Sequence, residues 1–188
     1  ENYGYTEDEA IDWCLTTPDD SFGCADSCME NIEMPSVQII HNSASPTVDV
    51  YVDGNLAVAD FEYRTATPVL DLPLEFSVGI APAGGEVIAT FPFELSSYGS
   101  YVVVASGIVG DESHPFDLLA STLDQEAADE NSFALKVMHG VTDAPAVDIY
   151  ADGNLLVENL SYGDFQGYLQ VPVGDYTLDI TAHGSSEA

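Results

Sequence analysis

The feature that most constrains the fold is a string of residues that occurs twice in the chain. PTVDVYVDGNL, residues 46–56, returns as PAVDIYADGNL, residues 145–155, with the same acids, tyrosine, turn and leucine in the same order. Apolar and polar residues alternate in both copies, which predicts a β-strand with one face toward a core and one toward solvent. The residues predicted to face the core are Val48, Val50 and Val52 in the first copy and Val147, Ile149 and Ala151 in the second.

Each copy ends in a predicted hairpin turn. Asp53-Gly54 and Asp152-Gly153 supply the positive φ angles of a tight type I′ turn, after which the chain returns as a second strand. Turn chemistry therefore explains Asp53 and Asp152 as structural residues. The weaker interpretation is a site for Ca²⁺ or another cation, although neither copy has the spacing of an EF-hand loop. Its candidate ligands are Asp49, Asp53, Asp148 and Asp152. No other cofactor is expected.

The correspondence between the two halves extends beyond the hairpin. VQIIH and LKVMH precede the two copies, so that His41 matches His139, and VLDLPLEFSVGIAPAGG later parallels YLQVPVGDYTLDITAHG. Short alternating strands without a long helical period are typical of an all-β sandwich, and we predict two such domains in tandem. The predicted parts are an N-terminal segment (1–35), a first repeat (36–109), an acidic connector with room for a strand (110–132), and a second repeat that lacks its last strands (133–188).

The second repeat is shorter than the first. After Gly84 the first repeat continues with two predicted strands in GEVIATFPFELSSYGSYVVVASG, whereas SSEA follows Gly184. A sandwich without these strands has an open edge and an uncovered apolar face, which soluble proteins avoid. The sequence leaves three explanations open: a longer natural chain, another segment of the same chain such as HPFDLLASTL, or a strand added by a neighbouring subunit.

The patterns VQIIHNSASPTVDVYVDGN and LKVMHGVTDAPAVDIYADGN resemble the tandem domains of a secreted prokaryotic family known as a domain of unknown function (4397-like). The resemblance covers residues 37–107 and 135 to the end. It implies an immunoglobulin-like or transthyretin-like β-sandwich in each repeat. It also implies an extracellular or cell-surface location after removal of a signal peptide, and it brings no catalytic residues to carry over.

The segment before residue 36 lies outside this resemblance. TEDEAIDWCL fits a short helix with Thr6 as N-cap and Glu9 as its capping-box partner, so the segment is predicted to be partly helical. All three cysteines are here, and in an exported protein we expect a disulfide between Cys14 and either Cys24 or Cys28. The remaining thiol is free, bridges to another chain or, least favoured, joins a metal site.

The charge of the chain excludes several classes of partner. There are 33 Asp and Glu against 2 Lys and Arg, which gives a formal net charge of -31. Such a surface repels nucleic acid and anionic lipid, and no apolar run approaches the length of a membrane helix. Saline or cation-rich surroundings suit the chain best, because ions screen the repulsion between its carboxylates.

No catalytic motif is present, so an enzyme is not expected. The sequence has no G-x-S-x-G elbow, no H-E-x-x-H and no Gly-rich phosphate loop, and His41 and His139 recur at equivalent places, as fold residues do. One interpretation is an extracellular structural protein, the subunit of a cell-surface filament or layer assembled head to tail through β-strand addition. The alternative is a surface adhesin or a carbohydrate- or cation-binding module, with Tyr51 and Tyr150 as exposed aromatic residues. The expected partners are other copies of the chain, or a surface glycan or protein.

Charge screening gives a first testable prediction. We expect the melting temperature to rise as NaCl increases from low to moderate concentration, because salt weakens the repulsion between carboxylates. Thermal unfolding followed by circular dichroism in a NaCl series measures this effect. A flat or falling melting temperature would contradict it, and a much larger response to Ca²⁺ at equal ionic strength would favour specific cation sites.

Overall fold

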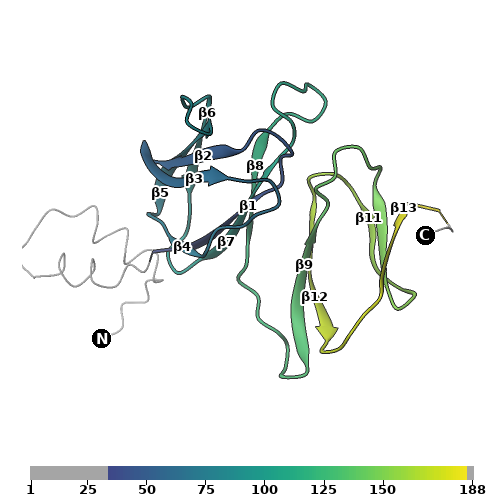
Figure 1. The fold of residues 1–188 in the computed structure, drawn as a ribbon. Coiled ribbons are helices and arrows are strands. Elements are labelled where there is room, and N and C mark those ends of the chain that lie inside the picture. Colours follow the sequence, from purple (N-terminus) through teal and green to yellow (C-terminus); the bar gives the residue numbers. More distant parts are fainter. Residues whose placement is uncertain (1–33, 186–188) are drawn as a thin grey trace, which may run out of the picture.

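The computed structural model describes residues 34–185, so the predicted N-terminal helix and the cysteine pairing lie outside the described range. This part of the chain is all-β and folds as two sandwiches in tandem, which confirms the predicted fold class (Figure 1). Residues 34–185 contain no helix that is long and apolar enough to span a bilayer.

The first sandwich consists of two four-stranded sheets. Their orders are β4-β1-β7-β8 and β3-β2-β5-β6. Neighbouring strands are antiparallel except β1 and β7, which run parallel in the register from Ser36 opposite Ser100 to His41 opposite Ala105. The strands are β1 (Ser36–His41), β2 (Val48–Val52), β3 (Asn55–Phe61), β4 (Leu70–Asp71), β5 (Glu75–Pro82), β6 (Ala89–Glu94), β7 (Ser100–Ser106) and β8 (Asp117–Thr122).

Alternation along these strands builds the core between the two sheets. Val48 and Val50 of β2 are 3% and 1% exposed, and Val78 and Ile80 of β5 are 4% and 3% exposed. Side chains from β6, β7 and β8 cover them from the other edges of the sandwich. Because β8 pairs with β7 along its whole length, part of the stretch expected as a connector belongs to the first sandwich. HPFDLLASTL therefore does not complete the second domain.

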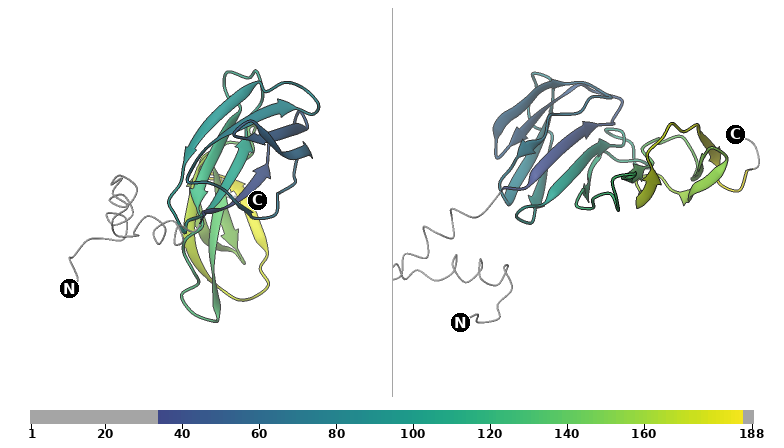
Figure 2. Two further views of the ribbon diagram at one scale, coloured as in Figure 1. Left: turned by 90° about the vertical axis from the view of Figure 1, so that its left-hand side faces the viewer. Right: turned by 90° about the horizontal axis from the view of Figure 1, so that it is seen from below.

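The second sandwich contains fewer strands. A three-stranded sheet of order β11-β10-β13 packs against a two-stranded sheet of order β12-β9 (Figure 2). The hydrogen-bonded registers match those of β3-β2-β5 and β4-β1 in the first domain. Counterparts of β6, β7 and β8 do not occur among its described residues. The strands are β9 (Ser132–Met138), β10 (Val147–Ala151), β11 (Asn154–Leu160), β12 (Phe165–Pro172) and β13 (Leu178–Ala182).

The burial of one aspartate in each repeat differs from the prediction. The alternation places Asp49 and Asp148 on the solvent face, but they are only 6% and 5% exposed. Asp49 Oδ1 accepts the N–H of Asp60 at 2.9 Å, and its Oδ2 accepts the N–H of Gly84 at 2.8 Å. The same two oxygens of Asp148 accept the N–H groups of Asn159 (2.7 Å) and Gly184 (3.2 Å). Backbone groups of the paired strand, β3 or β11, and of the turn near Gly84 or Gly184 therefore surround these carboxylates.

These carboxylates fix a β-bulge. The register between β2 and β3 shifts near Val50, and the shift recurs between β10 and β11 near Ile149. The donors that follow the shift, Asp60 and Asn159, have positive φ angles of 50° and 54°. A bulge exposes backbone groups that the ladder leaves unpaired, and a buried donor needs a partner. Each aspartate supplies that partner and ties the bulge to the turn after the neighbouring strand.

The hydrogen bonds accepted by Asp49 give a prediction for the stability of the fold. Hydrogen bonds from the N–H groups of Asp60 and Gly84 hold the pKa of Asp49 below its ordinary value of 3.8. A lowered folded-state pKa stabilises the fold above pH 3.8, and this contribution is lost as the pH falls through the folded-state pKa. We expect Asp49→Asn to lower the free energy of unfolding at neutral pH and to approach the wild type in acid. Urea unfolding at both pH values measures the difference.

The matched control is Asp60→Asn, which makes the same change of charge beside Asp49 but keeps the backbone N–H that the carboxylate accepts. It should leave stability at neutral pH close to that of the wild type. An Asp49→Asn deficit of equal size at neutral and acid pH would refute the role of the ionised carboxylate.

Candidate functional site: the uncovered face of the second domain

Part of the apolar face of the second domain is left uncovered by residues 34–185. Leu178 and Ile180 of β13 are 57% and 61% exposed, whereas Val78 and Ile80, at the same register positions of β5, are 4% and 3% exposed. Ile180 lies directly opposite Ile149, which is buried as predicted, so both side chains belong to the core face. The difference in exposure follows from the strands that cover the first domain and have no counterpart among the described residues of the second.

Two strand edges border this face. Among the described residues, β9 pairs with β12 alone and β13 pairs with β10 alone. In the first domain the equivalent strands β1 and β5 are paired on both sides. The cluster of buried apolar residues between its two sheets is small, with Ile149, Val157 and Leu160 at its centre. The second domain therefore combines an open sheet edge in each layer with an exposed apolar floor.

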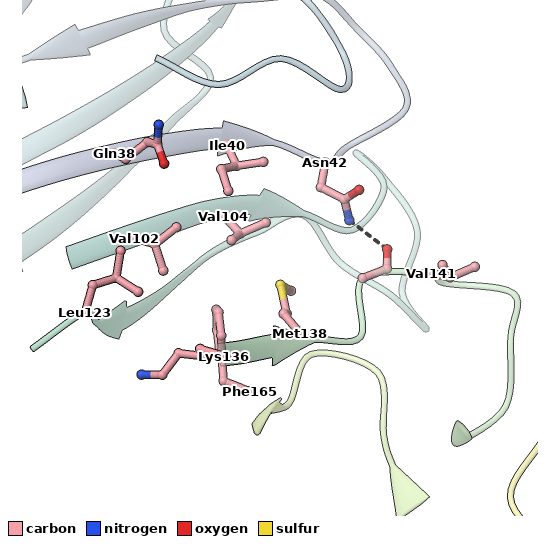
Figure 3. A pocket seen from close by; sticks show the side chains of 11 residues that line it. Gln38, Ile40, Asn42, Val102, Val104, Leu123, Lys136, Met138, Val141 and Phe165 are labelled. Carbon is pink, nitrogen blue, oxygen red and sulfur yellow. Dashed lines mark hydrogen bonds between the residues drawn. The ribbon is translucent and has the colours of Figure 1, made fainter. Parts of the chain in front are cut away.

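A separate hollow lies between the two domains. It is a cleft of about 550 Å³ between the outer face of β1 and β7 and the strand β9 (Figure 3). Gln38 and Ile40 of the first repeat face Lys136 and Met138, which occupy the equivalent positions of the second repeat. The domains thus meet through matching strand faces. The other apolar lining residues are Val102, Val104, Leu123, Val141 and Phe165.

Lys136 fastens the second domain to the end of β8. Its Nζ donates hydrogen bonds to Ser121 Oγ at 2.7 Å and to the carbonyl oxygen of Thr122 at 2.6 Å. The ammonium group also lies 4.3 Å from the centroid of the Tyr168 ring, and the Tyr168 hydroxyl donates to the same Thr122 carbonyl at 2.6 Å. One of the two strong bases in a chain of net charge -31 therefore serves the contact between domains.

The opposite end of the cleft is closed by polar contacts that the sequence did not reveal. Asn42 Nδ2 donates to the carbonyl oxygen of Gly140 at 2.7 Å, and the hydroxyl groups of Ser106 and Tyr162 lie 3.2 Å apart. The Tyr162 ring meets the His114 ring edge to face, with centroids 5.1 Å apart. The sequence does not relate Tyr162 to Ser106 or His114, because these residues become neighbours only when the chain folds.

The aspartates at the predicted turns have a second contact. Asp53 and Asp152 adopt φ angles of 48° and 49°, and their Oδ1 atoms accept the N–H of Ser77 at 2.8 Å and of Thr177 at 2.9 Å. The glycines that follow are Gly54 and Gly153, with φ angles of 77° and 76°. Each aspartate thus joins its hairpin to the neighbouring strand. Residues 34–185 contain no group of three or more His, Cys, Asp or Glu placed to hold a metal ion.

The paired histidines fix the turns that follow them. His41 Nε2 lies 3.2 Å from the carbonyl oxygen of Pro46, and its Nδ1 accepts the N–H of Ser43 at 3.3 Å. His139 repeats this pattern with the carbonyl oxygen of Pro145 at 3.0 Å. His41 is fully buried, and burial lowers its pKa. A neutral ring that donates through Nε2 satisfies both contacts, so the predicted fold role of these histidines is confirmed.

Comparison with known proteins classifies the chain. A family model described as Domain of unknown function (DUF4397) matches residues 35–139 and again residues 133–188. The chain belongs to the DUF4397 family. The first match spans all strands of the first sandwich, and the second spans β9 to β13. No curated protein matched the chain. The DUF4397 domain thus occurs twice here, and only the first occurrence has β6, β7 and β8 or their counterparts within the part of the chain that the structure describes.

The contact made by Lys136 gives a prediction for domain coupling. Replacement of Lys136 by Met removes two charged hydrogen bonds to the first domain, and such bonds contribute about 1.5 to 3 kcal/mol each when shielded from water and less near the surface. We expect Lys136→Met to lower the melting temperature of the second domain and to speed proteolysis in the stretch 123–131.

The control is Arg64→Met, which makes the same change of charge at the other strong base. Arg64 lies over the ring of Tyr63 in its own domain and makes no contact that joins the domains. Equal effects of the two substitutions on proteolysis would show that net charge, rather than the Lys136 contact, is responsible.

Proposed function

We propose that this DUF4397 protein is an extracellular structural protein, the subunit of a cell-surface filament or layer. Copies assemble head to tail when a strand from one copy completes the second domain of the next. The observation that carries the proposal is the exposure of Leu178 and Ile180 beside two unpaired strand edges. The same positions are buried in the first domain of the same chain, which serves as an internal reference.

The energetics favour an added strand. Burial of a Leu or Ile side chain stabilises a complex by about 1.5 to 3 kcal/mol. An added strand also satisfies backbone N–H and C=O groups along the edge that it joins, that of β9 or of β13, as in other cases of β-strand addition. These gains offset the cost of ordering the strand. A head-to-tail contact that does not close into a ring continues as a filament.

The charge of the chain sets the conditions for assembly. Two copies that carry a net charge of -31 each repel one another at low ionic strength. Screening by salt shortens the range of this repulsion to about 8 to 10 Å at physiological ionic strength. Assembly is therefore expected to strengthen as salt increases, in accord with an extracellular location in saline surroundings.

Substitutions on β13 test the proposal. We expect Leu178→Asp or Ile180→Asp to weaken self-association about tenfold or more, because each replaces an apolar contact of at least about 1.4 kcal/mol by a buried charge. Sedimentation velocity over a concentration series at moderate NaCl measures the association. Leu155→Asp is the control, because Leu155 is 50% exposed but lies opposite Tyr150 on the other face of the sheet.

A wild-type chain that stays monomeric over the whole series of concentration and salt would overturn the proposal. Equal association of the wild type and the two β13 variants would show that the copies meet elsewhere.

The inter-domain cleft supports a second candidate, a surface adhesin or a carbohydrate- or cation-binding module. The cleft offers about 550 Å³ lined by apolar side chains with Gln38, Asn42 and Lys136 among them. Tyr51 and Tyr150, the aromatic residues that favoured this function in the sequence, are half-buried. A filament requires self-association and a binding module does not, so a chain that stays monomeric in the sedimentation series would favour this second candidate.

A further inference from the structure

The uncovered face of the second domain is a slot for a parallel strand. Its walls are the open edges of β9 and β13, and its floor is formed by Leu178 and Ile180. In the first domain the corresponding edge of β1 is occupied by β7, which runs parallel to it. The register of that pair shows which positions of an incoming strand face the core.

The pattern of β7 defines what the slot accepts. Val103 and Ala105 of β7 are each 3% exposed in the first domain, and Tyr101 packs against the same core. The residues between them, Val102 and Val104, face the other way, into the inter-domain cleft. An occupant of the equivalent slot therefore needs apolar side chains at positions i, i+2 and i+4.

On the basis of the proposed strand addition, we infer that the occupant is the stretch of residues 10–16 (AIDWCLT) from a neighbouring copy. Ile11, Trp13 and Leu15 provide the three apolar positions of a strand in this stretch. The same residues also fit the short helix predicted from the N-cap at Thr6. A helix of this length is marginal in water on its own, whereas a strand in the slot gains backbone partners from β9.

The register supplies an electrostatic match. If Ile11, Trp13 and Leu15 take the positions that Tyr101, Val103 and Ala105 hold in β7, the pairing of β1 with β7 transferred to β9 sets Ile11 opposite Leu135 and Asp12 opposite Lys136. The Lys136 ammonium group has three donors, of which two are bound to the end of β8. Among residues 34–185 only the ring of Tyr168 lies near the remaining donor, and a carboxylate of an added strand is the stronger acceptor. Lys136 is one of two strong bases in the chain, so an acidic donor strand is drawn to this edge rather than to most others.

The positions of the donor and the slot fit contact between different copies. The described chain begins on the side of the first domain that faces away from the second domain (Figures 1 and 2). The segment 1–33 therefore starts from one end of the molecule, and the slot lies in the domain at the other end. Donation from copy to copy places the molecules head to tail in an open series.

Trp13 reports on this contact directly, because it is the one tryptophan in the chain. We expect its fluorescence to shift to the blue and to become protected from acrylamide quenching as the concentration of the full chain rises through the range of assembly. Trp13 that stays quenchable in assembled material would overturn the inference. Trp13 that is protected at every dilution would also overturn it, because the segment would then cover the slot of its own copy.

Complementary variants give the sharpest test. Trp13→Asp removes the donor and keeps the slot, whereas Ile180→Asp removes the slot and keeps the donor. Each variant alone is expected to associate at least about tenfold more weakly than the wild type, and an equimolar mixture should form dimers that grow no further. Phe22→Asp is the control for an aromatic-to-acid change outside residues 10–16 and should assemble like the wild type.

The outcomes distinguish this inference from the proposed function. A wild-type chain that does not assemble contradicts the proposed function and the inference together. A chain that assembles and loses this ability with Ile180→Asp, but keeps it with Trp13→Asp, retains the proposed function and overturns residues 10–16 as the donor. A mixture that yields no dimers also overturns the inference.

Discussion

A β-sheet with one apolar face is stable in water only when another layer covers that face. Both domains of this chain present the same alternating strands, and the burial of their side chains depends on the strands that surround them. Val78 and Ile80 lie beneath a complete second layer and are buried, whereas Leu178 and Ile180 hold the same positions and are exposed. Both domains belong to one chain and one family, so the missing covering strands explain why Leu178 and Ile180 are exposed.

The framework beneath this difference is the same in both repeats. Asp49 and Asp148 accept backbone N–H groups from a bulge and from the turn after the neighbouring strand, and His41 and His139 hold the loop that leads into the hairpin. All of these bonds lie within strands and turns that both domains contain. The second domain therefore keeps its local geometry and presents the open edges of β9 and β13 in defined positions.

Much of the fold was predictable from the sequence because the two repeats can be aligned with each other. Alternation and the Asp-Gly turns predicted the hairpins, and the shortness of the second repeat predicted the uncovered face. The burial of Asp49 was not predictable, because its partners lie on Asp60 and Gly84, and periodicity does not show a bulge. The role of Tyr162 and the membership of β8 in the first sandwich depend on pairing between distant segments, which local patterns do not specify. The cysteines and the predicted N-terminal helix lie outside the described residues.

The proposed assembly requires that the slot between β9 and β13 is open in a single copy and is filled when copies assemble. Hydrogen–deuterium exchange in dilute and assembled samples at the same NaCl concentration tests this most directly. The amides of β9 that point away from β12 should exchange quickly in the dilute sample and slowly in the assembled one, while the amides of β1 that point toward β7 should be slow in both. Slow exchange along this edge of β9 in the dilute sample, or fast exchange that assembly leaves unchanged, would contradict the proposed assembly.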